Sequence, residues 1–169
     1  MKLSLKKLPK IIPKITSVLL IVVGVFMIMA GVASTIFTYT SVARENIITP
    51  ADASIPETQV RGPLTLKAQS DIIRHHVLKM TGGKTYSEMP QKIQQLNAKG
   101  EVVRDSKGEP IMVANDARNI WITATTLTTA LNLAIISYVI SLLSIVIGFM
   151  FVLVGVSFRV LMARVVISI

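Results

Sequence analysis

Two long uncharged apolar runs constrain this chain more than any other feature. Residues 15–37 contain no charged side chain, and neither do residues 120–158. A helix of about 20 residues crosses a hydrocarbon core roughly 30 Å thick, so the first run predicts a span over residues 15–39. The second run is too long for one crossing and too short for two. We place the second span at residues 134–158, which predicts a mostly α-helical membrane protein.

This placement makes a two-helix transmembrane hairpin with an outer domain between the spans. Tyr39 and Tyr138 then mark the same outer interface, as an aromatic belt would. Residues 119–133 continue the second helix outside the bilayer and carry an apolar stripe at helical spacing. The stripe needs a partner helix, which we expect to come from the outer domain, with self-association as the alternative. Its members are Ile120, Ala124, Leu127, Leu131 and Ala134.

The formal charge of +9 is concentrated at the ends of the chain. Five lysines and no acid lie in residues 1–14, and both arginines of residues 159–169 follow the second run. Basic residues beside apolar runs mark cytoplasmic flanks that face anionic lipid. The two tails are therefore predicted to be cytoplasmic, and residues 40–118 to form an extracytoplasmic domain. A nucleic-acid-binding domain would gather its basic residues on a folded face, so we expect no nucleic-acid partner.

A cleavable signal peptide is the alternative reading of the first run. Gly31, Val32 and Ala33 place small residues where a signal peptidase cuts. The run is longer than the roughly 7 to 15 apolar residues of such signals, and it continues through Ile36 and Phe37. We therefore favour an uncleaved span.

Each span carries two glycines seven residues apart, Gly24 and Gly31 in the first and Gly148 and Gly155 in the second. Seven residues make nearly two helical turns, so each pair lies on one helix face and allows another helix to approach closely. These four residues are predicted helix-packing contacts, between the spans or with a partner protein, although glycine is common in membrane helices. Neither span contains an ionisable core residue of the kind that ion and proton pathways need, which disfavours a transporter.

The outer domain begins with a proline-containing stretch that predicts an extended surface segment. A helix follows, with Thr65 as its N-cap and Gly82-Gly83 as its stop. The residues from Thr85 to Glu88 fit a capping box that opens a short helical segment. Residues 101–113 predict a small β-hairpin around Ser106-Lys107-Gly108. The expected domain is therefore α-rich.

The only histidines, His75 and His76, raise the question of a metal site. Adjacent helical residues point about 100° apart, so these two cannot chelate one ion. Asp71 and His75 have the useful four-residue spacing, but two ligands fall short of a catalytic site. One histidine is expected to pack against the 120–134 stripe and the other to face solvent. Asp71, both histidines and Lys84 remain candidates for ligand binding or pH sensing.

Two segments, GPLTLKAQSDIIRHHVLKMTGGKTYSEM and EPIMVANDARNIWITATTLTTALNLA, carry a family resemblance. Residues 60–158 resemble a family of small actinobacterial two-span membrane proteins whose members often bear the label "aromatic ring-opening dioxygenase". The label implies an iron enzyme, which the geometry at His75 and His76 contradicts. The resemblance implies a bacterial plasma membrane setting and, by analogy with respiratory complexes, an accessory role.

The expected function is that of a non-enzymatic accessory or assembly subunit of a cell-envelope or respiratory membrane complex. Its partners would be the lipid bilayer and other membrane subunits or a second copy. No catalytic group is expected: the chain has no cysteine, no phosphate-binding glycine loop and no nucleophile triad, and we expect no cofactor and no metal. One alternative is a membrane-anchored sensor binding a ligand near Lys67, Asp71, His75 and Lys84. Another is an envelope enzyme holding a metal at Asp71 and His75.

Overall fold

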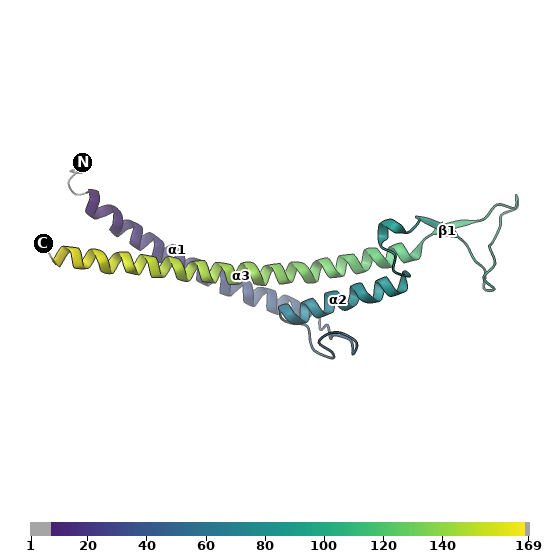
Figure 1. Cartoon of the computed structure of the whole chain (residues 1–169), viewed down its shortest axis with the longest axis horizontal. Helices are drawn as coiled ribbons and strands as arrows, with labels where there is room; N and C mark the ends of the chain where they lie inside the picture. The colour runs from purple at the N-terminus through teal and green to yellow at the C-terminus, as the bar shows by residue number, and fades with distance from the viewer. Residues whose placement is uncertain (1–7, 168–169) are drawn as a thin grey trace. The chain divides into compact units, whose positions relative to one another are not determined.

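Helices dominate the computed structural model, which describes residues 8–167 and the side chains of residues 11–164 (Figure 1). The long helices α1 and α3 are each long and apolar enough to cross a membrane, by length and composition. The described elements are α1 (Leu8–Arg44), α2 (Pro63–Met80), a 3-10 turn η1 (Tyr86–Glu88), the strands β1 (Lys92–Gln94) and β2 (Met112–Ala114), and α3 (Asp116–Ile167).

The chain divides into two compact units, and α3 contributes to both. The first unit comprises Met1–Glu45 and Ala134–Ile169, and the second comprises Asn46–Leu133. The division falls at Ala134, where the second span was predicted to begin. α1 starts at Leu8 and incorporates Pro13, so helix also occupies part of the predicted basic tail. Residues 1–7 of that tail lie outside the described residues.

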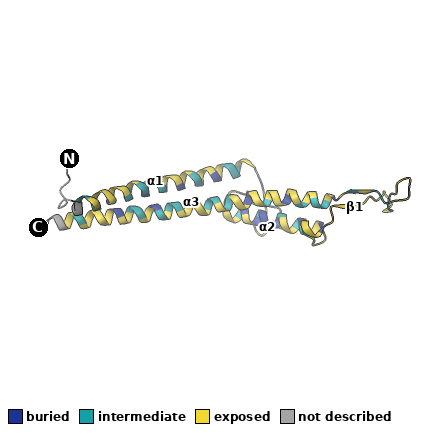
Figure 2. Cartoon of the chain, turned by 90° about the horizontal axis from the view of Figure 1, so that it is seen from above, coloured by how far each residue is buried: buried dark blue, intermediate teal, exposed yellow. Residues whose placement is uncertain are grey.

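In the first unit, α1 and the second part of α3 pack as an antiparallel pair along a narrow seam (Figure 2). The buried residues of α1 recur every seven positions, namely at Ser17, Gly24, Gly31 and Thr38. A strict seven-residue repeat keeps one face of a helix turned toward its partner through a left-handed supercoil. The seam is therefore narrow, and the large apolar side chains on the other faces stay exposed.

In the second unit, α2 begins three residues earlier than predicted. Gly62 is the N-cap and Pro63 occupies the first helical position, where its missing N–H costs nothing. Thr65 is not the cap but lies one turn inside the helix, and its hydroxyl accepts hydrogen bonds from the N–H groups of Gly62 and Arg61 at 3.2 and 3.0 Å. The predicted stop is confirmed, because Gly82 and Gly83 both have positive φ.

The segment before α2 is a closed turn rather than the extended surface stretch that was predicted. The Thr49 hydroxyl accepts a hydrogen bond from the N–H of Thr58 at 2.9 Å, and Ile48 forms an antiparallel bridge with Gln59. Val60 is completely buried and Thr49 nearly so. Proline limits regular structure here without preventing a compact fold.

α2 is buried on two opposite faces. At 100° per residue, Leu66, Ser70 and Val77 lie on one face, and Ala68 and Ile72 lie on the other. The first face packs on the start of α3, since the Ser70 hydroxyl donates a hydrogen bond to the side-chain oxygen of Asn132 at 3.3 Å. α2, the helix between the two apolar runs, is therefore the partner that the α3 stripe was predicted to need.

The stripe itself is rotated from the predicted one. Ala124 and Leu131 are buried as expected, but Ile120 and Leu127 are 41% and 50% exposed. The cavity between the two helices is lined instead by Trp121 and Thr128, together with residues of α2. The predicted and the observed stripe share Ala124 and Leu131, and α2 packs against the observed one.

Residues 91–114 form an arm that contains no buried side chain. β1 pairs with β2 in antiparallel register, with Ile93 opposite Val113. Beyond this pair, three chain segments meet in a ring of backbone hydrogen bonds between Gln95, Val103 and Ile111, each 2.8 or 2.9 Å long. The predicted hairpin is present at its tip, where Arg104 bridges Pro110. Further from the tip, residues 112–114 pair with residues 92–94, a strand that was not predicted.

Candidate functional site

The closest approach between α1 and α3 occurs at the glycines. A Cβ atom built on Gly24 would lie 2.6 Å from the carbonyl oxygen of Gly148, and one built on Gly148 would lie 2.6 Å from the carbonyl oxygen of Gly24. Gly31 meets Ile145 at 2.6 Å and Gly155 meets Ile21 at 2.7 Å in the same construction. These positions have no room for any side chain, so the structure places all four predicted glycines in one seam.

Hydroxyl side chains also cross the seam between α1 and α3. Ser17 donates to the carbonyl oxygen of Gly155 at 2.8 Å, and Ser144 donates to that of Met27 at 2.9 Å. The Ser141 hydroxyl donates to that of Ser34 at 2.8 Å. Small residues that let backbones approach, combined with hydroxyls that bond across the gap, are the usual contacts between helices in a lipid environment.

The serines and threonines of the seam were not singled out from the sequence, although their spacing could have found them. Ser17 precedes Gly24 by seven residues, and Thr38 follows Gly31 by seven. Extending the glycine repeat by one heptad in each direction therefore identifies both.

Tyr39 and Tyr138 follow directly after two residues that contact one another. The hydroxyls of Thr38 and Ser137 lie 2.7 Å apart across the seam, which places the two tyrosines at the same level of the helix pair. Tyr39 is 42% exposed. This arrangement is what a pair of interface tyrosines requires.

The predicted ligand-binding residues do not converge on a common point. Asp71 forms an ion pair with Lys67, one turn away on α2, and both side chains are largely exposed. Lys84 and His75 are exposed as well. Among residues 8–167, no three His, Asp or Glu side chains are grouped so that they could hold a metal ion.

His76 has a partner that the sequence did not indicate. Its Nε2 atom lies 2.7 Å from an Oδ2 oxygen of Asp52 in the turn before α2. The hydrogen bond from His76 holds the pKa of Asp52 below its ordinary value of 3.8. His76 therefore connects α2 to the turn, and the expectation that one histidine packs on the α3 stripe is wrong.

Arg118, near the start of α3, holds the segment after α2. Its guanidinium lies 3.9 Å from the centre of the Tyr86 ring and donates to the carbonyl oxygen of Met89 at 2.8 Å.

The predicted capping box is present, because Glu88 accepts hydrogen bonds from the N–H and the hydroxyl of Thr85. Those two bonds lower the pKa of Glu88.

No family model, curated protein or solved structure matches this chain.

Proposed function

We propose that this chain is a non-enzymatic integral membrane protein that serves as an accessory or assembly subunit of a larger membrane complex. In this proposal α1 and the second part of α3 cross the bilayer as a hairpin. The positive-inside rule orients it with both termini in the cytoplasm and residues 40–133 outside.

The observation that carries the proposal is the pairing of α1 with α3 through glycines while their other faces stay apolar and exposed. Phe26 and Phe37 are 71% and 72% exposed, and Phe149 is 54% exposed. A soluble protein rarely leaves a contiguous apolar surface of this length uncovered. A bilayer covers it without further contacts.

The arm of residues 91–114 supports a role in assembly. A two-stranded hairpin without a packed face is at best marginally stable in water, and this arm presents Ile93, Leu96 and Met112 to solvent at 41%, 58% and 48% exposure. A protein partner that buries these side chains would supply the core that the arm lacks. The arm is therefore the surface through which we expect the complex to form.

Affinity purification from the native membrane in mild detergent, followed by mass spectrometry, tests the assembly role. We expect one or more membrane proteins at stoichiometric ratio. Replacing Leu96 and Met112 by serine should release them, whereas replacing Leu64, which is 76% exposed on α2, should not. Recovery of the chain alone, or of a homo-oligomer insensitive to the arm variant, would refute the role.

Cysteine labelling tests the orientation, since the chain has no cysteine of its own. A membrane-impermeant maleimide should label Ser106→Cys in intact cells. It should label Ser168→Cys only after the membrane is opened. The reverse pattern would invert the topology.

One observation favours a second function, pH sensing by the outer unit. The Asp52 to His76 contact joins the turn to α2 through a carboxylate and an imidazole, and its hydrogen bond lowers the pKa of Asp52. Under this alternative, hydrogen exchange of residues 46–62, corrected for its intrinsic pH dependence, should be faster at a pH below the pKa of Asp52 than at neutral pH, and His76→Gln should remove this difference. Equal exchange at both pH values would exclude it.

A further inference from the structure

The seam between α1 and α3 opens beyond its last small-residue contact. At Ser17 and Gly155 the helices touch through a buried hydrogen bond of 2.8 Å. About one helical turn further toward the termini lie Lys14 on α1 and Arg159 on α3, and Met162 lies seven residues after Gly155. Long side chains at these positions keep the backbones apart, and in Figure 1 the two helices diverge toward their ends.

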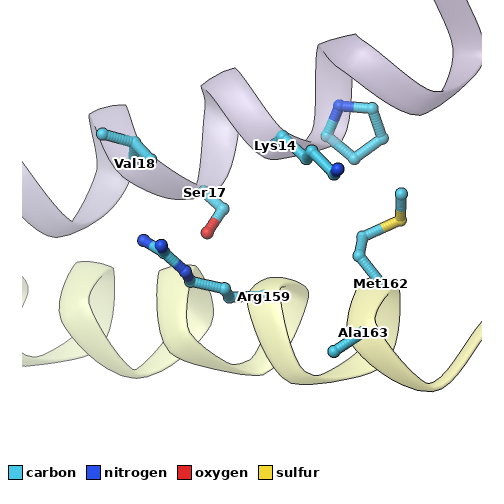
Figure 3. Close-up of a pocket in the computed structure, with 7 residues that line it drawn as sticks. Lys14, Ser17, Val18, Arg159, Met162 and Ala163 are labelled. Atoms are coloured by element: carbon cyan, nitrogen blue, oxygen red, sulfur yellow. The ribbon is translucent and has the colours of Figure 1, made fainter. Parts of the chain in front are cut away.

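This divergence creates a cavity of about 590 Å³. It is lined by Pro13, Lys14, Ser17, Val18, Arg159, Met162 and Ala163. Figure 3 shows that the charged ends of Lys14 and Arg159 both reach into the space between the helices. Val18 and Met162 supply apolar walls beside them. The cavity therefore combines two cations with an apolar lining at the end of the hydrophobic part of the pair.

The two helices that form this cavity offer it no acidic side chain. Residues 1–44 and 117–169 contain neither aspartate nor glutamate. Two cations that face one gap repel each other, and the repulsion is strongest where apolar walls exclude water. A bound anion would remove the repulsion and accept the hydrogen bonds that the ammonium and guanidinium groups can donate.

We propose that this cavity binds the phosphate of an anionic phospholipid. The inference rests on the proposed membrane insertion, which sets Lys14 and Arg159 at the level of the lipid headgroups, just outside the uncharged runs. Basic pockets between membrane helices bind anionic headgroups in this way. Arg159 supplies a planar donor pair for two phosphate oxygens, and Lys14 supplies a point charge. Val18 and Met162 contact the start of the acyl chains.

The cavity volume fits this ligand. Sites for small molecules typically measure about 300 to 1,000 Å³, and this cavity of about 590 Å³ falls within that range. The Ser17 hydroxyl already donates to Gly155, so it can accept from Arg159 without competing for the phosphate.

Native mass spectrometry of the full chain in neutral detergent tests the proposal. The probes are phosphatidylglycerol, phosphatidylcholine and, separately, an excess of inorganic phosphate. We expect phosphatidylglycerol to bind at a one-to-one ratio and phosphatidylcholine to bind at least tenfold more weakly. Lys14→Gln and Arg159→Gln should each weaken phosphatidylglycerol binding about tenfold, because each removes one charge-assisted contact.

Arg164→Gln is the matched control. Arg164 lies on the same helix, is exposed and does not line the cavity, so its loss should change binding less than twofold. Equal weakening by Arg159→Gln and Arg164→Gln would reduce the effect to general charge and overturn the site. Equal binding of the two lipids would also overturn it. Complete displacement of the lipid by inorganic phosphate would identify a free-phosphate site and overturn the lipid assignment.

Flotation of the reconstituted protein with liposomes after alkaline washing separates this inference from the proposed function. Protein that washes off the liposomes refutes membrane insertion itself. Protein that stays inserted but binds both lipids equally refutes only the headgroup site. Circular dichroism of each variant checks that helix content is retained, so that a loss of binding is not a loss of fold.

Discussion

Replacing Gly24 by alanine should open the helix pair, because the new methyl group has nowhere to go. Its Cβ would lie 2.6 Å from the carbonyl oxygen of Gly148, and ordinary contact begins at 3.4 Å. The shortfall is 0.8 Å, the difference between these two distances. To relieve this clash the two helices must move apart, which opens a gap at their neighbouring contacts. A gap of 0.5 to 1 Å loses about a quarter to a half of the dispersion energy between the facing atoms. Overpacking of this kind costs about 1 to 3 kcal/mol.

The cost can be measured with a reporter built across the seam. The hydroxyls of Ser34 and Ser141 lie 2.8 Å apart, and the chain has no other thiol once both are replaced by cysteine. Disulfide formation in this double variant reports a closed pair. In a titration with a denaturing detergent, Gly24→Ala should lower the detergent fraction at which the disulfide stops forming.

Gly62→Ala is the matched control, since a Cβ on Gly62 would meet nothing within 4 Å and its φ of −120° suits any residue. It should leave the midpoint unchanged. Gly24→Ala and Gly148→Ala share one gap, so the double replacement should cost less than the sum of the two. An unchanged midpoint for Gly24→Ala, or strict additivity of the pair, would refute the argument that these glycines set the distance between the helices.

Three further predictions concern the second unit. Leu66→Ala should cost about 2 to 5 kcal/mol of unfolding free energy because Leu66 is fully buried, while Leu64→Ala should stay within about 0.5 kcal/mol in the same denaturant titration. The hydrogen bond from His76 lowers the pKa of Asp52 in the folded protein, so Asp52 stabilises the fold above pH 3.8, and this stabilisation is lost as the pH falls through the folded-state pKa. In Asp52→Asn, the melting temperature should therefore depend less on pH between about pH 5 and pH 2. Arg118→Met should raise amide exchange in residues 84–91, because the ring and the carbonyl oxygen that hold this segment lose their partner.

The long helices α1 and α3 were easier to predict from the sequence than the second unit. Uncharged length and the seven-residue glycine spacing are local properties of the chain, and both carry directly into α1 and α3. The α3 stripe was harder to read because two stripes share Ala124 and Leu131. Hydrophobicity alone predicts that Ile120 and Leu127 face α2. In the structure Arg74 of α2 lies over the Trp121 ring at 5.8 Å, so the stripe that contains Trp121 faces α2 instead.

Long-range pairing accounts for the features that the sequence did not reveal. The strand of residues 92–94 reads KIQ, with little strand character, and is defined only by its partner at residues 112–114. Asp52 and His76 are 24 residues apart in the chain, and the turn that brings them together depends on Thr49. Neither contact leaves a local periodicity that could have been detected.

The position of the glycines changes what a test of assembly can mean. From the sequence alone, the glycines could form the binding surface for a partner protein, and loss of the complex in a Gly31→Leu variant would then point to that surface. A Cβ atom added at Gly31 or Gly155 would lie less than 3 Å from side-chain and backbone atoms of the chain's own opposite helix. A leucine at either position would separate α1 from α3 first and disturb any partner second. Assembly is therefore tested at the arm, whose exposed Leu96 and Met112 can be changed without entering the seam.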